Sequence, residues 1–287
     1  MTDLASKVSV FGSFGFVLGE FCRQYQDEIV RIPKHQVVPH SNHILYGIST
    51  TDNYNVFDNV TIDIETNLIH LVEVLDACRK TYKSDFTFTF LSSWFVYGKN
   101  GVSENFEDAP CNPTGFYSIT KRAAEQLLIS YCETFGIKYQ ILRLANVLGA
   151  KDYKVSKKKN ALQFLLDRLV HNEDIELYDG GKFYRDYIDV QDCAKAIHAC
   201  MQHAKYPSYN VSNGKSSLFK DLIDYSVKYS GSKSNVWDKP TNPEFHSVVQ
   251  AKDIFLNNAK LLETGYVQSI PIEMSLRTII DTYRGRI

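Results

Sequence analysis

The chain has 287 residues, 44% of them hydrophobic and 23% charged, and a formal net charge of −1. This composition is ordinary for a globular protein, and the balanced charge argues against nucleic acid or an acidic membrane as a partner. No apolar run reaches the ~18 residues that a membrane-spanning helix needs.

Strand-like and helix-like segments alternate through the first half of the chain. Strands are predicted at residues 8–11, 28–32, 44–48, 86–91 and 139–144. Helices are predicted at residues 17–25, 63–79 and 117–135, and the apolar side chains of the last two recur at helical spacing. Strands that alternate with helices in this way predict an α/β fold with a doubly wound parallel sheet.

The alternation breaks after Gly149. A polar, lysine-rich stretch at 150–160 is followed by predicted helices at 161–169, 191–203, 218–229 and 274–283, and by short strands at 175–177 and 186–190. Loops containing proline and asparagine join the last helices. We interpret this part of the chain as a smaller lobe set against the main sheet.

A glycine-rich turn, Gly12 to Gly19, directly follows the first predicted strand. Glycines at this point allow the backbone to approach a pyrophosphate, and the N-terminus of the next helix favours an anion. We therefore predict that the turn binds a dinucleotide through Gly12, Phe14, Gly15 and Phe16.

Tyr117 and Lys121 are four residues apart at the start of a predicted helix, shortly after the strand that ends in Ser92 and Ser93. Residues at this spacing share one helix face. An ammonium there can lower the pKa of a phenol, which could then transfer protons near neutral pH. The same spacing occurs at three other pairs, which lack the strand, turn and helix and are interpreted as surface pairs: Tyr153/Lys157, Tyr178/Lys182 and Tyr229/Lys233.

Six features occur in a fixed order along the chain: the glycine-rich turn, Asn67, and the segments 91–98, 113–121, 142–149 and 180–187. In these features the chain resembles the extended short-chain dehydrogenase/reductase family of nucleotide-sugar epimerases, dehydratases and reductases. The resemblance implies a Rossmann-type doubly wound parallel sheet with a smaller C-terminal α/β lobe. It also implies a dinucleotide-binding domain at 1–149 plus about 190–213, and a nucleotide-sugar-binding lobe at 150–189 and 214–287.

The resemblance implies the following roles for single residues. Tyr117 would be the general acid/base, Lys121 would lower its pKa and hold the nicotinamide ribose, and Ser93 would hydrogen-bond the reacting sugar oxygen. Ser93 and Trp94 would contact the sugar, and Asn146 and Arg185 would bind the nucleotide diphosphate. An arginine fork suits a diphosphate, although a salt bridge from Arg185 to Asp179 or Asp186 is the simpler alternative.

The cofactor site departs from the family pattern. Leu18 stands where a third glycine is usual, and the stretch between Gly12 and Tyr46 is short. No acidic residue closes the second strand to bind a ribose diol, and Arg31 lies there with two further basic residues. Arg31 would suit the 2′-phosphate of NADP, whereas the likeness to epimerases favours NAD, so both cofactors stay open.

The residues after Ser93 restrict the reaction. The 4,6-dehydratases of this family carry an Asp-Glu pair where this chain has Trp94 and Phe95. Elimination of water needs such acid and base groups, so we reject dehydratase activity. Phe95 also replaces the cysteine of the fucose-synthase type, which makes a 3,5-epimerase/4-reductase less expected.

The cysteines and histidines are dispersed. The six cysteines form no Cys-x-x-Cys motif, which is typical of reduced thiols in a cytoplasmic protein. The eight histidines lack ligand spacing, so we predict no metal site.

Together these features predict an NAD(P)-dependent nucleotide-sugar 4-epimerase that acts through a 4-keto intermediate. The alternatives are a nucleotide-sugar 4-ketoreductase, or a non-catalytic dinucleotide- or sugar-nucleotide-binding protein, because a fold does not fix a function. The resemblance also implies a homodimer through the helices at 63–79 and 117–135.

Overall fold

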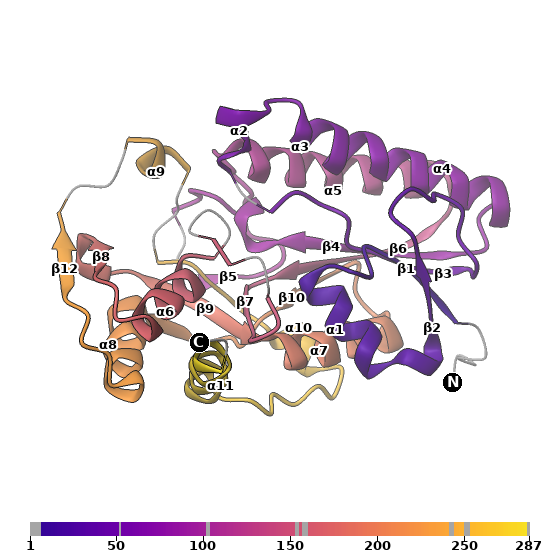
Figure 1. The fold of residues 1–287 in the computed structure, drawn as a ribbon. Helices are drawn as coiled ribbons and strands as arrows, with labels where there is room; N and C mark the ends of the chain where they lie inside the picture. Colours follow the sequence, from indigo (N-terminus) through magenta and orange to yellow (C-terminus); the bar gives the residue numbers. More distant parts are fainter. Residues whose placement is uncertain are drawn as a thin grey trace.

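The computed structural model describes residues 7–51, 53–101, 104–152, 155–156, 160–240, 244–249 and 253–285. A six-stranded sheet lies at its centre with helices on both faces (Figure 1). All of its strand pairs are parallel. From one edge to the other the strands are β10 (Ser208–Val211), β6 (Lys138–Leu144), β4 (Thr87–Ser93), β3 (His43–Tyr46), β1 (Val8–Phe11) and β2 (Ile29–Ile32).

One face of the sheet is covered by a layer of helices that also forms the upper edge of the molecule in Figure 1. The layer comprises α2 (Asn55–Asp58), α3 (Ile62–Ile64), the π-helical η2 (Glu65–Ile69), α4 (His70–Tyr82) and α5 (Phe116–Phe135). Buried apolar side chains of α4 and α5 pack there against β3, β4 and β6. Parallel strands covered on both faces are apolar along most of their length, and every residue of β1 is buried.

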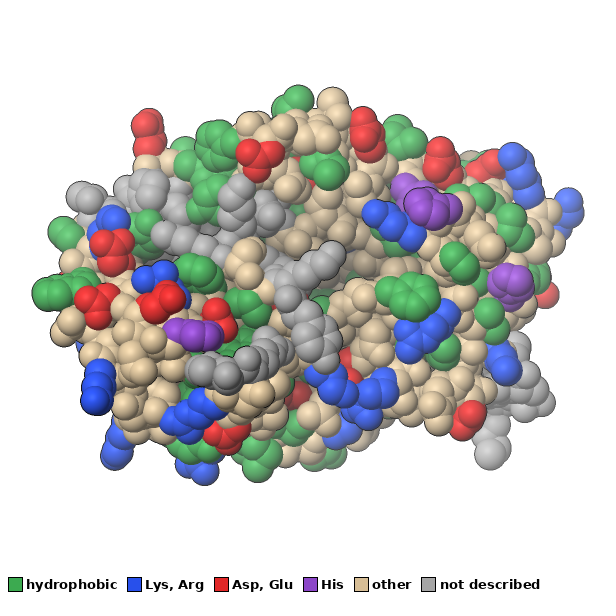
Figure 2. Space-filling model, viewed as in Figure 1, with side chains coloured by type: hydrophobic (Ala, Val, Ile, Leu, Met, Phe, Trp, Pro, Cys, Tyr) green, Lys and Arg blue, Asp and Glu red, His purple; other side chains and the backbone are tan. Residues whose placement is uncertain are grey.

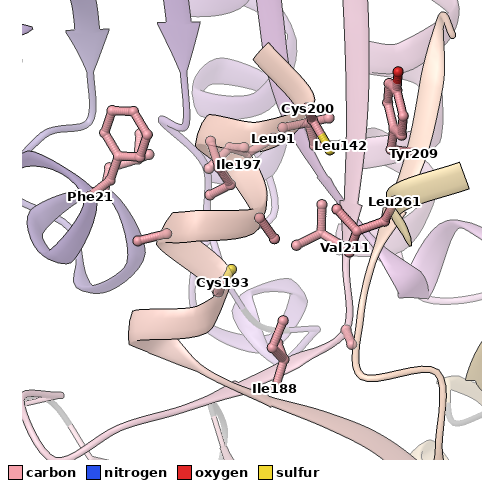
Figure 3. Packing of buried hydrophobic residues seen from close by; sticks show 14 of the residues in the cluster. Phe21, Leu91, Leu142, Ile188, Cys193, Ile197, Cys200, Tyr209, Val211 and Leu261 are labelled. Atoms are coloured by element: carbon pink, nitrogen blue, oxygen red, sulfur yellow. The ribbon is translucent and has the colours of Figure 1, made fainter. Parts of the chain in front are cut away.

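The other face is covered by α1 (Phe16–Gln24), α7 (Val190–His203) and the short α10 (Ala259–Leu262). In Figure 3, Cys193, Ile197 and Cys200 of α7 point toward Leu142 and Val211 of the sheet. This contact packs α7 against strands β6 and β10 of the large sheet. Both α7 and β10 are distant in sequence from the other strands of that sheet.

A smaller part of the molecule contains three short sheets. These are β11 (Ser216–Leu218), β9 (Tyr184–Asp189) and β7 (Asn146–Leu148); β12 (Val236–Lys239) and β8 (Ile175–Tyr178); and β13 (Phe255–Leu256) and β5 (Glu104–Asn105). The remaining elements are η1 (Gln26–Glu28), η3 (Trp94–Val96), η4 (Asp179–Gly181), α6 (Ala161–Val170), α8 (Phe219–Ser230), α9 (Glu244–Val249) and α11 (Ile272–Arg284). Helices α6, α8 and α11 surround a separate apolar core.

The predicted fold class is confirmed: a Rossmann-type parallel α/β sheet carries a smaller α/β part. The helix predicted at 63–79 differs in one respect, because its first half contains the π-helical turn η2. Asn67 of η2 makes hydrogen bonds to two neighbouring segments, and such side-chain bonding accompanies departures from regular helix geometry.

Within the ranges that the structure describes, the large sheet ends at β2. In the usual doubly wound order a further strand lies outside the second one, whereas here residues 33–42 lead from β2 directly across β1 to β3. The short stretch noted in the sequence therefore corresponds to a sheet with one strand fewer on this side. None of the described helices combines the length and the apolar character that a membrane crossing requires.

Candidate active site

The three predicted catalytic residues come together where β4 ends and α5 begins. Ser93 is the last residue of β4, and Lys121 Nζ donates a hydrogen bond to the carbonyl oxygen of Leu91 in the same strand at 2.8 Å. The rings of Tyr117 and Phe95, two residues after Ser93, lie 6.0 Å apart at 83°. The side chains of Tyr117 and Lys121 lie on the buried face of α5.

Lys121 is buried in an apolar setting. Its ammonium lies 4.2 Å from the centre of the Phe90 ring, and the side chain is only 2% exposed. Burial lowers the pKa of Lys121 to about 7, although the charge of Glu125 one helical turn further on opposes this effect. The amine can therefore change its protonation state near neutral pH.

The Ser93 hydroxyl is bonded to the turn that follows β4. Ser93 Oγ accepts a hydrogen bond from the backbone N–H of Phe95 at 3.3 Å, which caps the turn η3. A serine hydroxyl that accepts in this way still has its own proton to donate. The residue is half-buried, as a group that meets a substrate must be accessible.

Asn67 ties the start of α5 to the loop after β3. Its Nδ2 donates to Thr120 Oγ1 at 3.0 Å and to Thr50 Oγ1 at 2.8 Å, and Thr120 donates to the carbonyl of Tyr117 at 2.9 Å. In the sequence Asn67 was only a carrier of the family resemblance, and Thr120 had no role. Their link depends on contacts between distant segments, which no local pattern reveals.

Glu125 and Arg143 form a buried ion pair behind Lys121. Arg143 donates to both carboxylate oxygens of Glu125, at 3.0 and 2.9 Å. Burial raises the pKa of Glu125, but the charge and hydrogen bonds of Arg143 lower it below its ordinary value. The pair joins α5 to β6 and fixes the helix that carries Tyr117.

The glycine-rich turn has the shape that a cofactor pyrophosphate requires. Gly12 has a φ of +86°, and a side chain there would lie 3.0 Å from the backbone of Gly47. Gly15 is the N-cap residue of α1, whose first turn contains no acidic residue and whose N-terminus has no side-chain cap. Phe16 is the first residue of this helix. The positive end of the helix dipole and a first turn without an acidic residue favour an anion at this helix end.

Arg31 and Phe14 lie together beside this turn. Arg31 Nη1 donates to the carbonyl oxygen of Ser13 at 2.7 Å, and its guanidinium lies 5.5 Å from the centre of the Phe14 ring. The Phe14 side chain is 77% exposed. This arrangement presents a cation and an apolar ring at the end of β2.

Arg185 is a buried cation held by aromatic rings. It is 7% exposed, its Cζ lies 5.3 Å from the centre of the Trp94 ring and 4.8 Å from that of Phe183, and burial lowers its pKa. Its Nη1 donates to the Tyr184 carbonyl at 2.8 Å. Within the described ranges it forms no ion pair, so the simpler alternative of a salt bridge is not supported there.

Asp186, one of the carboxylates considered as a partner for Arg185, is bonded elsewhere. It accepts the backbone N–H groups of Asn213 and Gly214, each at 3.1 Å, and burial raises its pKa to about 7. Asn146 Nδ2 donates to the Asp186 carbonyl at 3.0 Å, which places Asn146 beside the strand of Arg185.

A cavity of about 300 Å³ lies in the smaller part of the molecule, and Phe183 is among the residues that line it. Phe183 borders both the cavity and the guanidinium, and it stacks on Phe219 with ring centres 4.7 Å apart. Arg168, Asp174 and Glu176 add polar groups to the lining. Aromatic faces with a few polar groups are typical of sites for planar heterocycles.

The remaining predicted features carry no site in the described part of the chain. Tyr153 and residues 157–159 lie outside it. Tyr229 donates to Asp281 at 2.8 Å on the protein surface, as expected for a surface pair. The residues that the structure describes contain no group of three or more potential metal ligands among His, Cys, Asp and Glu.

The sequence is similar to known nucleotide-sugar enzymes. Residues 36–212 match the sequence model of the NAD dependent epimerase/dehydratase family. The chain is 30% identical over 188 residues to "Uncharacterized UDP-glucose epimerase YtcB" of Bacillus subtilis, which covers 60% of this chain and 57% of that relative. It is 26% identical over 242 residues to GDP-6-deoxy-D-mannose reductase of Pseudomonas aeruginosa, with 78% and 74% covered.

The solved structures agree with the fold. UDP-glucose 4-epimerase of Thermus thermophilus in complex with NAD superimposes with a TM-score of 0.83 over 98% of this chain and 100% of that chain, at 19% identity. At this identity the likeness shows a common fold.

Proposed function

The chain belongs to the NAD-dependent epimerase/dehydratase family and is an enzyme, and on this premise we propose that it is a nucleotide-sugar 4-epimerase that acts through a 4-keto intermediate. The observation that carries the proposal is the grouping of Ser93, Tyr117 and Lys121 around the end of β4, close to the buried guanidinium of Arg185. Membership of a family of enzymes sets aside the non-catalytic alternative.

NAD or NADP is the cofactor of this family, and the described residues fit it. Gly12, Gly15 and Phe16 would hold the pyrophosphate at the start of α1, and Phe14 and Arg31 would lie beside the adenosine ribose. Lys121 and Tyr117 would hold the nicotinamide ribose. When bound, the cofactor would supply an acceptor and donor of hydride for C4 of the sugar.

Tyr117 would move the proton that accompanies this hydride. In the first step its ionised oxygen accepts the hydroxyl proton at C4 as the sugar becomes a ketone, and in the second step it returns the proton to the same oxygen. Ser93 donates a hydrogen bond to that oxygen throughout. Rotation of the keto sugar between the steps presents its other face, which inverts C4 without any net change in oxidation state.

The nucleotide would lie in the smaller part of the molecule. Arg185 and Asn146 would bind the diphosphate, with Trp94 beneath the guanidinium, and the base would enter the cavity next to Phe183. A desolvated guanidinium without a carboxylate partner in the described ranges is suited to a diphosphate. On this basis we also propose that 1–149 with about 190–213 binds the cofactor and that 150–189 and 214–287 bind the nucleotide sugar.

A nucleotide-sugar 4-ketoreductase is the second candidate. It would use the same residues once, in the reducing direction, and would consume NADPH. Arg31 favours it, because a guanidinium at the end of β2 suits the 2′-phosphate of NADP. A relative named as a reductase is consistent with it. The two candidates differ in whether the reduced cofactor disappears in proportion to the product.

The exposed face of α4 and α5 supports a homodimer. In Figure 2 hydrophobic side chains lie among charged ones along the upper edge, where α2, α3 and α4 are found in Figure 1. A two-fold contact between copies would cover four exposed apolar residues of this face: Val72, Ile119, Leu127 and Phe135. We name these four residues the α4–α5 face.

We also propose a cytoplasmic location. All six cysteines are free thiols and five of them are buried, which suits a reducing compartment.

The Tyr117→Phe variant tests the proposed reaction. We expect it to interconvert UDP-glucose and UDP-galactose at least about 10²-fold more slowly than the wild type, because the ring remains but the proton carrier is lost. Tyr229→Phe is the matched control, since it removes the phenol of a surface pair with the same spacing to a lysine. Equal turnover by Tyr117→Phe and the wild type would refute the assignment.

The same assay separates the two candidates. An epimerase produces the second UDP-sugar with catalytic amounts of cofactor, whereas a ketoreductase oxidises one NADPH for each 4-keto sugar that it reduces. The absorbance of the reduced nicotinamide gives the amount of NADPH consumed. Comparison of this amount with the amount of product formed distinguishes the two candidates.

A further inference from the structure

A continuous series of ring contacts joins Tyr117 to Arg185. The ring of Phe95 meets that of Tyr117 edge to face, with centres 6.0 Å apart at 83°. Phe95 stacks on Trp94 with centres 4.0 Å apart at 25°, and the Arg185 guanidinium lies over Trp94 at 5.3 Å. Trp94 and Phe95 thus contact one group from α5 and one group from β9.

The two rings are held firmly by the backbone beneath them. They belong to the short turn η3, which begins directly after Ser93 and is capped by the hydrogen bond from the N–H of Phe95 to Ser93 Oγ. Trp94 is 5% exposed, and the following Val96 is fully buried. A buried ring in such a turn has little freedom to change its rotamer.

The position of Arg185 depends on these rings. In the part of the chain that the structure describes, no carboxylate lies within ion-pair distance of its guanidinium, which is placed between Trp94 and Phe183. A guanidinium over an aromatic face is attracted to it, and more so when both are desolvated. Removal of the Trp94 ring would take away one of the two aromatic faces that hold the cation and would weaken the constraint on its direction.

The position of the Tyr117 ring depends on Phe95 in a similar way. Edge-to-face contacts between rings are directional, and the two ring planes here are nearly perpendicular. A displacement of about 1 Å in a reacting group can slow a reaction about 10²-fold. The ring of Phe95 therefore affects the reaction without touching the reacting atoms.

We infer that Trp94 and Phe95 are positioning residues that set the separation between the nucleotide diphosphate and the sugar carbon that reacts. The inference rests on the proposed function. Trp94 acts through Arg185 on the binding of the diphosphate, and Phe95 acts through Tyr117 on the proton transfer. The two neighbouring residues therefore have separable effects, one on nucleotide affinity and the other on turnover.

Calorimetric titration with UDP tests the role of Trp94. We expect Trp94→Leu to bind UDP about tenfold more weakly, the effect of losing one desolvated cation–π contact, and to raise KM with little change in kcat. Trp94→Phe keeps an aromatic face under the guanidinium and should recover most of the affinity. A merely structural role would not separate the leucine variant from the phenylalanine variant in this way.

Steady-state kinetics with UDP-glucose tests the role of Phe95. We expect Phe95→Leu to lower kcat about tenfold while its affinity for UDP stays that of the wild type. Phe95→Tyr keeps the ring and should recover much of the rate. Circular dichroism and NADH binding, measured on all four variants, show whether each remains folded.

Tryptophan fluorescence gives a measurement that alters neither ring. Trp94 and Trp237 are the two tryptophans of the chain, so a Trp237→Phe variant has Trp94 as its single reporter. Titration with UDP to saturation should change the emission of Trp94, because the bound diphosphate would pair with the Arg185 guanidinium that lies over the indole.

The results of these experiments distinguish a failure of this inference from a failure of the proposed function on which it rests. If the wild type binds UDP, but Trp94→Leu binds it equally well and the Trp94 emission does not respond, the inference is overturned and the proposed function stands. The same holds if Phe95→Leu keeps the wild-type kcat. If the wild type binds NADH but neither UDP nor GDP, the proposed function fails, and this inference fails with it.

Discussion

Lys121 is a cation in surroundings that favour its neutral form. Its partners in the described residues are the carbonyl of Leu91 and the face of the Phe90 ring, and Glu125 is bound by Arg143. Burial of such an ammonium costs free energy of folding. The residue is therefore expected to serve catalysis at the expense of stability, as functional residues often do.

We expect the Lys121→Met variant to be inactive and more stable than the wild type at pH 6. The pKa of Lys121 is about 7 in the folded chain and about 10.4 in the unfolded one. Protonated lysine therefore destabilises the fold fully below pH 7, and this penalty disappears as the pH rises from 7 to 10. The gain of the variant should shrink over that range, as thermal unfolding at several pH values would show.

Lys80→Met is the control for this measurement. Its side chain is 71% exposed and pairs with Asp76 on the surface of α4, so its removal should change the stability little at any of these pH values. A Lys121→Met protein that is less stable than the wild type at pH 6 would show that the ammonium stabilises the fold.

The sequence placed Ser93, Tyr117 and Lys121 near one another, whereas it did not reveal the contacts that support them. The order of strand, turn and helix around these three residues, together with the family resemblance, pointed to their grouping; their catalytic roles stay a prediction. The contact of Arg185 with Trp94 and the bonds of Asn67 to Thr120 join segments that are distant in sequence. Such contacts follow from the packing of whole elements, which hydrophobic periodicity does not encode.

At the level of elements, Gly98 closes the turn after η3. Its φ is +56°, and a Cβ there would lie 2.0 Å from the carbonyl oxygen of Asn112. Gly98 also forms a bridge with Asn112, which leads the chain toward the start of α5. The glycine is thus needed for both its conformation and its lack of a side chain.

We expect Gly98→Ala to destabilise the protein by about 2–4 kcal/mol, because a left-handed conformation and a backbone clash add together. Gly231→Ala is the matched control. Gly231 has a similar φ of +61°, but a Cβ there would meet nothing within 4 Å, so about 1 kcal/mol of conformational cost is expected. Denaturant unfolding of the two variants measures the difference, and equal losses would show that the contact with Asn112 relaxes.

The long elements and the apolar strands of the large sheet were predictable, and the shortest strands of the smaller part were not. Helix α5 spans Phe116–Phe135, close to the predicted 117–135, because a long amphipathic stripe and Gly136 define it. Strands β5 and β13 have two residues each and form a two-stranded sheet with one another in the described part of the chain. They exist because the fold brings them together, so their own sequences carry little signal.

For the whole molecule, the α4–α5 face makes the oligomeric state testable. We expect Leu127→Glu to convert the dimer into a monomer, because a carboxylate in the centre of an apolar contact cannot be solvated. Light scattering should show the mass of one chain, 32.8 kDa, for the variant and about twice that for the wild type.

Leu262→Glu is the control for the dimer. Leu262 is an exposed leucine of α10, on the other side of the sheet from α4 and α5, so the variant should keep the mass of the wild type. A wild type with the mass of one chain at micromolar concentration would contradict the proposed dimer.

The missing outer strand has a consequence for the protein in a crowded cell. Among the described residues no strand pairs with the outer side of β2, and an unpaired sheet edge can act as a template on which other chains aggregate. Strand β2 has only four residues, includes the charged Arg31 and is followed at once by Pro33. A short strand with a charged residue and a following proline pairs poorly with a strand of another chain. We therefore expect the edge at β2 to resist aggregation, although the chain is shorter there.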